Sequence, residues 1–155
     1  MTIAIIVFTV LSVLYWFFQL GSLIWSIVTI PRLKDFKYGD LERWPLVSVI
    51  ITACNEGEGI EAAMNSRLED DYPALEFILI DDRSTDNTAE LVDNIAAKDP
   101  RVKVIHITEL PKGWLGKVHA LHRGTLEAKG EFLLFSDGDV HVKKGTMQRL
   151  IARCE

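Results

Sequence analysis

Two aspartates, Asp137 and Asp139, stand one residue apart at the end of the apolar run LLFSDGDV, residues 133–140. Gly138 between them lets the backbone turn through dihedral angles that a side chain would disfavour, so both carboxylates can approach one point. Hard divalent cations such as Mg²⁺ take oxygen ligands and commonly use only one or two protein carboxylates together with substrate phosphates. The pair therefore predicts a site for a divalent cation and a diphosphate-containing substrate.

The elements that must position this pair are short apolar runs, rich in β-branched or aromatic residues, as strands buried on both faces are. They are VSVIITA (47–53), LEFILID (75–81), VKVIHI (102–107) and EFLLFSD (131–137). Amphipathic stretches over 58–70, 86–99 and 116–130 lie between them and predict helices. Strands and helices in alternation predict an α/β fold with a mostly parallel sheet and helices on both faces.

Ligands of such sheets bind beyond the carboxyl ends of the strands, where CNEGEG, DDRSTDNT, TELPKGWLGK and SDGD follow the four runs. A single carboxylate in such a segment is often only a helix cap or a solvated turn residue. Several carboxylates converging on one edge of a sheet repel one another unless a cation or a hydrogen-bond donor compensates them. Their convergence is the reason to predict a binding site there.

The first 31 residues contain no Lys, Arg, Asp, Glu or His, so all 39 formally charged Lys, Arg, Asp and Glu residues follow them. As a helix, the apolar run 3–30 would be roughly 42 Å long, more than the roughly 30 Å of a bilayer's hydrocarbon core. A cleaved signal peptide is the alternative, but the start MTIAII has no basic residue. We expect residues 1–31 to be a transmembrane anchor.

Basic residues follow this anchor at Arg32, Lys34, Lys37 and Arg43, and none precedes it. Because basic flanks stay on the cytoplasmic side, we expect a single-pass protein of the cell (inner) membrane whose remaining part is cytoplasmic. Residues 32–45 would be a juxtamembrane connector, and residues 46–155 one α/β domain.

Composition argues against two classes of protein. Two cysteines are too few for a disulfide framework, fit no zinc spacing and suit a reducing compartment. The net charge of −5, without a Lys/Arg cluster interleaved with aromatic residues, argues against a nucleic-acid-binding surface.

Four blocks in this order, VSVIITACNE, LIDDRSTDNTAELV, GWLGKVHALHRG and LLFSDGDV, resemble the nucleotide-binding half of the family 2 glycosyltransferases, which have the GT-A fold. The resemblance covers residues 46 to about 151. The apolar N-terminus and the segment LPKGWLGKVHALHRG look most like the subgroup that glycosylates lipids such as ceramide, hopanoids and carotenoids. The resemblance implies transfer of a sugar from a nucleotide-diphosphate sugar, expected to be a UDP-sugar, to a lipid or membrane-associated acceptor. It also implies that the transfer depends on a metal and inverts the configuration of the sugar.

The resemblance also assigns roles to residues of this chain. Asp82 would accept the N3 hydrogen of uracil, and Thr52 and Glu56 would line the nucleoside pocket. Lys117 would meet the nucleotide, at a helix start that itself favours anions. Asp137 would face the ribose or the metal, and Asp139 would bind the Mg²⁺ or Mn²⁺ that bridges the diphosphate. Glu56 could instead be only a first-turn acid of its helix.

The sequence also allows other interpretations of these motifs. LLFSDGDV also matches the D-x-D motif of haloacid-dehalogenase-like phosphatases, although that motif follows the first strand there and three predicted strands precede it here. Trp114 would either wall a sugar or lipid pocket or anchor its loop on the core. Because the family places its general base after the D-x-D, we expect the sequence to continue beyond Glu155. A catalytically incomplete, membrane-tethered nucleotide-binding module is the alternative.

Overall fold

The computed structural model describes residues 2–30 and 43–154. It divides into an N-terminal helix and a unit that contains the sheet, and each is described by itself. The predicted connector 32–45 falls mostly outside the described residues, and so do Arg32, Lys34 and Lys37.

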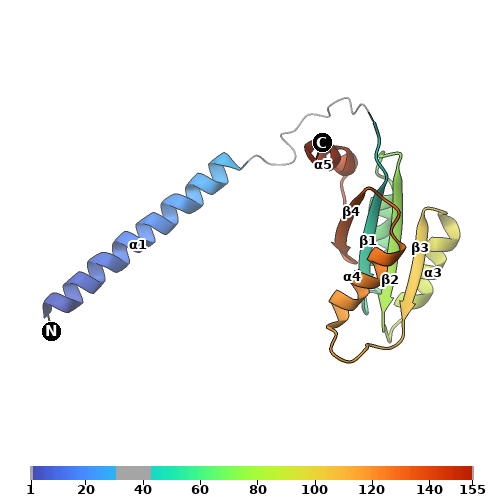
Figure 1. The fold of residues 1–155 in the computed structure, drawn as a ribbon, viewed down its shortest axis with the longest axis horizontal. Coiled ribbons are helices and arrows are strands. Elements are labelled where there is room, and N and C mark those ends of the chain that lie inside the picture. The colour runs from blue at the N-terminus through green and yellow to red at the C-terminus, as the bar shows by residue number, and fades with distance from the viewer. Residues whose placement is uncertain (1, 31–42, 155) are drawn as a thin grey trace. The chain divides into compact units, whose positions relative to one another are not determined.

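The N-terminal unit is the helix α1, Thr2–Thr29 (Figure 1). Its 28 residues have a most apolar window with a mean hydropathy of 2.2, and none of that window is buried. By length and composition this helix is able to cross a membrane, as the uncharged N-terminus predicted.

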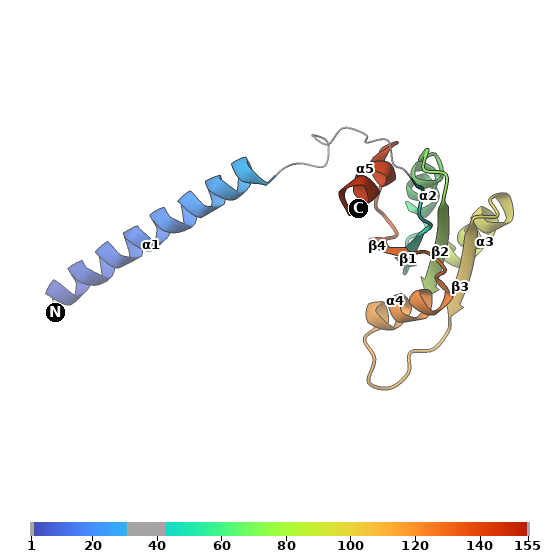
Figure 2. The same ribbon diagram turned by 45° about the horizontal axis from the view of Figure 1, so that its top comes forward.

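The second unit is a four-stranded, fully parallel sheet of the order β3-β2-β1-β4, which can be followed in Figure 2. Its strands are β1 Val47–Ala53, β2 Leu75–Asp82, β3 Val102–Ile107 and β4 Phe132–Asp137. The helices are α2 Ile60–Leu68, α3 Thr88–Lys98, α4 Gly116–Glu127 and α5 Thr146–Cys154. The α/β class, the parallel sheet and the four strand positions were therefore predicted correctly.

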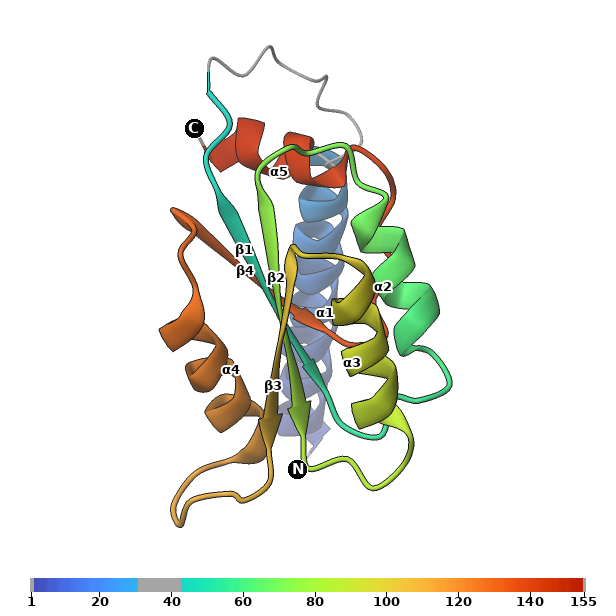
Figure 3. The same ribbon diagram turned by 90° about the vertical axis from the view of Figure 1, so that its right-hand side faces the viewer.

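Helices cover both faces of the sheet, with α2 and α3 on one face and α4 on the other (Figure 3). The alternation of side chains along each strand sorts the core in the same way. Val49, Ile51 and Phe77 belong to the larger core with α2 and α3, whereas Ile50 and Ile80 belong to a smaller one with α4. Successive residues of a strand therefore pack alternately against the layer of α2 and α3 and against α4.

Helix α4 ends at Glu127, so the prediction that it runs to Gly130 is wrong. Ala128 is already extended, with ψ of 138°, and the chain then runs beside β1. Gly130 donates its N–H to the Ser48 hydroxyl at 2.7 Å, and a Cβ at Gly130 would lie 2.5 Å from the Ser48 nitrogen. The glycine serves this close backbone approach rather than a helix cap.

Strand β4 is not buried on both faces, contrary to its continuous apolar run. Its residues alternate between half-buried and exposed, and Leu133 and Phe135 are 41% and 50% exposed. Among the described residues β4 pairs only with β1, so it forms an edge of this sheet. The side chains of Leu133 and Phe135 lie on the face of the sheet that carries α4, so this face of β4 is largely exposed.

Candidate nucleotide-binding site

Strand register brings the predicted site residues to one edge of the sheet. Thr52 on β1 pairs with Asp137 on β4 and with Ile80 on β2, so their side chains share the face of α4. Asp82 lies two residues beyond Ile80 and points to the same face. Three of the predicted residues are therefore neighbours because adjacent parallel strands end at the same edge.

A cavity of about 250 Å³ lies at this edge. All six residues predicted for the site line it, together with three residues that were not predicted. The predicted ones are Thr52, Glu56, Asp82, Lys117, Asp137 and Asp139, and the others are Ala53, Cys54 and Gly138. Four carboxylates thus converge on one concave space, as the positions of their segments predicted.

Two cations already contact these carboxylates. Lys117 at the start of α4 places its Nζ 2.5 Å from Oδ1 of Asp137. Arg83 donates from Nε to Oδ1 of Asp82 at 2.7 Å and from Nη2 to Oδ2 at 3.1 Å. The hydrogen bonds to Asp82 raise the pKa of Arg83. Arg83 has a φ of 59°, a left-handed conformation that is unusual for a residue with a side chain.

The carboxylates of the cavity suit a hard divalent cation whose remaining coordination positions are filled by substrate oxygens. Among residues 2–30 and 43–154, no three His, Cys, Asp or Glu side chains group closely enough to hold a metal by themselves. Asp137 and Asp139 nevertheless supply two carboxylates at the rim of one cavity. Mg²⁺ and Mn²⁺ sites of this kind take one or two protein carboxylates and fill the other positions with phosphate oxygens and water.

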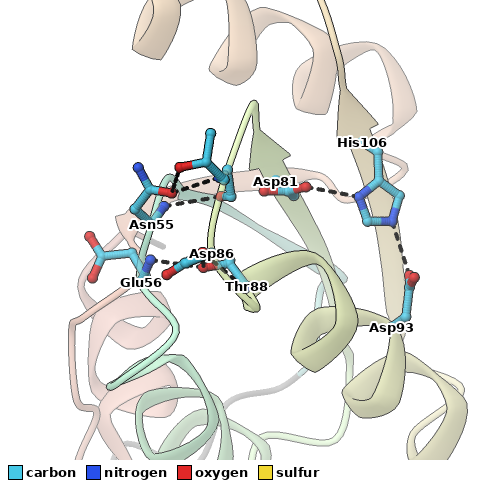
Figure 4. Close-up of polar contacts among 9 residues, drawn as sticks. Asn55, Glu56, Asp81, Asp86, Thr88, Asp93 and His106 are labelled. Carbon is cyan, nitrogen blue, oxygen red and sulfur yellow. Dashed lines mark hydrogen bonds and ion pairs between the residues drawn. The ribbon is translucent and has the colours of Figure 1, made fainter.

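The loop after β1 is tied to the loop after β2 (Figure 4). Asn55, with a φ of 56°, accepts a hydrogen bond from the Thr85 N–H at 2.8 Å, and its own N–H donates to the Ser84 hydroxyl. The Glu56 N–H donates to the Thr88 hydroxyl at 2.9 Å. These bonds fix the backbone that carries Glu56 toward the cavity.

Asp86 completes this link. Its carboxylate accepts hydrogen bonds from the Thr88 hydroxyl and N–H and from the Gly57 N–H. These donors lower the pKa of Asp86. The segment STD of DDRSTDNT, residues 84–86, therefore links the two loops through hydrogen bonds.

Asp81 is the neighbour of Asp82 on β2 and therefore points to the opposite face of the sheet. It forms a different group, with His106 and Asp93 (Figure 4). His106 on β3 lies between two carboxylates, with Nδ1 3.0 Å from Asp81 Oδ2 and Nε2 3.0 Å from Asp93 Oδ1. The two contacts, that with Asp81 first, raise the pKa of His106. This group joins β2, β3 and α3 behind the site.

Trp114 lies outside the residues that line the cavity. Its ring stacks on His122 at 5.1 Å between centroids and meets His119 edge-on at 5.4 Å. Of the two readings of Trp114, these contacts favour the anchor, because the loop before α4 is packed onto the helix's own side chains.

Residues 48–155 match the protein family described as Glycosyl transferase family 2. A glycosyltransferase named GlyG from Streptococcus pneumoniae serotype 4 is 35% identical over 105 residues, which are 68% of this chain and 34% of that protein. A relative from Campylobacter jejuni, named GalNAc(5)-diNAcBac-PP-undecaprenol beta-1,3-glucosyltransferase, is 31% identical over 109 residues, 70% of this chain and 34% of that protein.

Solved structures give the same picture. The mannosyltransferase PcManGT from Pyrobaculum calidifontis, in complex with GDP-Man and Mn²⁺, aligns with a TM-score of 0.63 and 27% identity over 77% of this chain and 36% of that one. TarS residues 1–349 from S. aureus, in complex with UDP-GlcNAc, align with a TM-score of 0.60 and 32% identity over 69% of this chain and 30% of that one. This chain therefore belongs to glycosyl transferase family 2 and has the GT-A fold. It spans about a third of the length of the curated relatives it matches.

Proposed function

We propose that this chain is the nucleotide-sugar-binding part of a metal-dependent glycosyltransferase that uses a UDP-sugar. The observation that carries the proposal is the cavity at the carboxyl edge of the sheet, which is lined by all six residues for which the sequence predicted a role. Membership of glycosyl transferase family 2 supports it. The nucleotide sugars named with PcManGT and TarS support it as well.

Each residue then has a separate task. Asp82 accepts the N3 hydrogen of uracil, and Thr52 and Glu56 wall the nucleoside. Lys117 moves from Asp137 to the diphosphate, because a phosphate carries more charge than the carboxylate it leaves. Asp137 and Asp139 would hold a divalent cation, and the chemistry that the cation would supply is neutralisation of negative charge on the nucleoside diphosphate leaving group.

The acceptor belongs to the proposal as well. A lipid or membrane-associated hydroxyl is supported by α1, which is long and apolar enough to span a bilayer, and by the undecaprenol in the printed name of the Campylobacter relative. All carboxylates of the cavity have tasks in nucleotide or metal binding, so we place the general base of the transfer outside residues 1–155.

Calorimetric titration of the chain in detergent micelles with UDP and CDP, each with EDTA or with Mn²⁺, tests this function. Cytosine lacks the N3 hydrogen that Asp82 would accept, so UDP should bind about tenfold or more tightly than CDP, the equivalent of one hydrogen bond to a charged group. Mn²⁺ should strengthen the binding of both nucleotides. Equal affinities for UDP and CDP would contradict the task given to Asp82, and the absence of any Mn²⁺ effect would contradict the metal site.

A further inference from the structure

An arginine occupies the core-facing side of α2. The buried residues of this helix are Ile60, Ala63, Met64 and Arg67, which recur at i, i+3, i+4 and i+7 as the apolar face of an amphipathic helix does. Arg67 takes the fourth of these positions and is 1% exposed. Burial of a guanidinium costs free energy, whereas burial of a leucine or methionine at the same position would stabilise the fold. The sequence therefore accepts a cost at this one position.

The guanidinium of Arg67 contacts the backbone of the D-x-D turn. Nη2 donates to the carbonyl oxygen of Asp137 at 2.5 Å and to the Ser136 hydroxyl at 3.2 Å. Nη1 donates to the carbonyl oxygen of Gly138 at 3.3 Å. One planar fork thus holds two successive carbonyl groups, an arrangement that the single ammonium of a lysine does not reproduce.

Arg67 approaches the turn from the side opposite the cavity. Ser136 pairs with Ile51, which belongs to the core of α2, whereas Asp137 pairs with Thr52 on the face of α4. Arg67 is accordingly not among the residues that line the cavity. It is placed to hold the turn and not to touch a ligand bound there.

The positive charge of Arg67 is only weakly compensated by negatively charged groups. Within the described part of the chain, no carboxylate forms an ion pair with its guanidinium, and its Nε is buried without a hydrogen-bond partner. Burial lowers the pKa of Arg67, and the negative charge of Asp139 opposes that effect. The main partners of this cation are thus the carbonyl groups between the two aspartates.

We propose that Arg67 is a positioning residue that fixes the backbone of residues 136–138 and thereby sets the separation of the Asp137 and Asp139 carboxylates for a metal-bound diphosphate. This inference rests on the proposed function, because it assigns those two carboxylates to the metal. Without the fork, the Gly138 carbonyl loses its Arg67 donor, and the Asp137 carbonyl keeps only the longer hydrogen bonds from the Val140 N–H at 3.4 Å and the Ser136 hydroxyl at 3.3 Å, so the turn relaxes. Asp82 is on β2 and is not held by Arg67, so the reading of the base should be unaffected.

The test uses Arg67→Met and Arg67→Lys in the chain as it exists, in detergent micelles. UDP affinity is measured with EDTA and with Mn²⁺, and the thermal unfolding midpoint is recorded for each variant. Arg101→Met is the matched control, because the Arg101 guanidinium also donates to a backbone carbonyl, that of Leu68, at 3.0 Å and does not line the cavity.

We expect both Arg67 variants to bind UDP in EDTA within about twofold of the wild type and to lose about tenfold of the Mn²⁺ enhancement, which is about 1.4 kcal/mol. Arg101→Met should lower the unfolding midpoint and keep the full enhancement. If Arg67→Met does not fold, Arg67→Lys, which retains the charge on a single nitrogen but not the planar fork, decides the outcome.

Three results would overturn the inference. Full Mn²⁺ enhancement in a folded Arg67→Lys would mean that charge and not the fork matters. Equal losses with and without Mn²⁺ would mean a general structural role like that of Arg101. An unchanged Mn²⁺ enhancement of UDP binding in Arg67→Met would mean that the D-x-D turn keeps its conformation without Arg67. An absence of Mn²⁺ enhancement in the wild type would instead contradict the proposed function, so the two failures are distinguishable.

Discussion

At the scale of single residues, the cavity is lined by carboxylates that already have cationic partners. Lys117 contacts Asp137, and Arg83 contacts both oxygens of Asp82. These contacts relieve the repulsion that converging carboxylates would otherwise feel. In the proposed function, a nucleotide would compete with Arg83 for Asp82 and would draw Lys117 away from Asp137. Lys117 itself lines the cavity, whereas Arg83 does not.

Lys117→Met tests this exchange. The side chains of Lys117 and Asp137 are 60% and 55% exposed, and such ion pairs contribute about 0–1 kcal/mol to stability. We expect the free energy of unfolding in urea to change by less than about 1 kcal/mol, while the UDP dissociation constant rises about tenfold through loss of a charged hydrogen-bond donor.

Lys103→Met is the control for Lys117→Met. Lys103 forms a comparably exposed ion pair with Glu127 and lies outside the cavity. Its loss should leave UDP binding unchanged. An unaltered UDP affinity in Lys117→Met, or an equal loss in Lys103→Met, would remove Lys117 from the diphosphate site.

At the scale of elements, the loops and strands behind the cavity are held by side chains rather than by the sheet alone. The loop after β1 is fastened to the loop after β2 through Asn55 and Asp86. His106 joins β3 to β2 through Asp81 and to α3 through Asp93. Because His106 lies between two carboxylates, this second link depends on protonation.

Stability should therefore depend on pH through His106. Its pKa in the folded protein is raised, so the folded state binds a proton more tightly than the unfolded state, in which the pKa is near 6.5. The stabilisation is complete below about pH 6.5 and is lost as the pH rises through the raised value. Urea unfolding followed from about pH 6 upward should show a falling free energy of unfolding in the wild type and a flatter profile in His106→Gln.

His141→Gln serves as the comparison for His106, since His141 is an exposed histidine beyond β4. It should keep the slope of the wild type. Identical pH profiles for the wild type and His106→Gln would show that the bridge between Asp81 and Asp93 adds no proton-linked stability.

Much of the fold could be predicted from the sequence, because the spacing of apolar residues that marks a strand or a helix is a local feature. The place of the site could be predicted because ligands of parallel sheets bind at the carboxyl ends of the strands. The segments that hold Asp82 and Asp137 were found in this way, whereas Thr52 was predicted from the resemblance to the family 2 glycosyltransferases. Arg67 was not, because its spacing with Ile60 and Met64 marks a core position, and only the folded chain brings a guanidinium under a turn about 70 residues away. The end of α4 was missed because Gly130 is required by the approach to β1 and not by a helix cap.

At the scale of the whole molecule, we propose that α1 spans a membrane and that the sheet-containing unit binds the nucleotide. The apolar α1 and the basic residues that follow it lead us to propose that the sheet-containing unit lies in the cytoplasm. In intact cells, external protease should then leave the exposed loop around Lys112 uncut, and permeabilised cells should release fragments cut there. Cleavage in intact cells, with a cytosolic control protein unharmed, would reverse the orientation.

The most direct test of the central claim measures UDP binding by wild type, Asp82→Ala and Asp139→Ala, each with EDTA and with Mn²⁺. We expect Asp82→Ala to weaken UDP binding under both conditions, because base recognition needs no metal. We expect Asp139→Ala to leave binding in EDTA nearly unchanged and to abolish most of the enhancement by Mn²⁺. Undiminished UDP binding by Asp82→Ala, or a full Mn²⁺ enhancement in Asp139→Ala, would contradict the division of this cavity into a base-reading side and a metal-binding side.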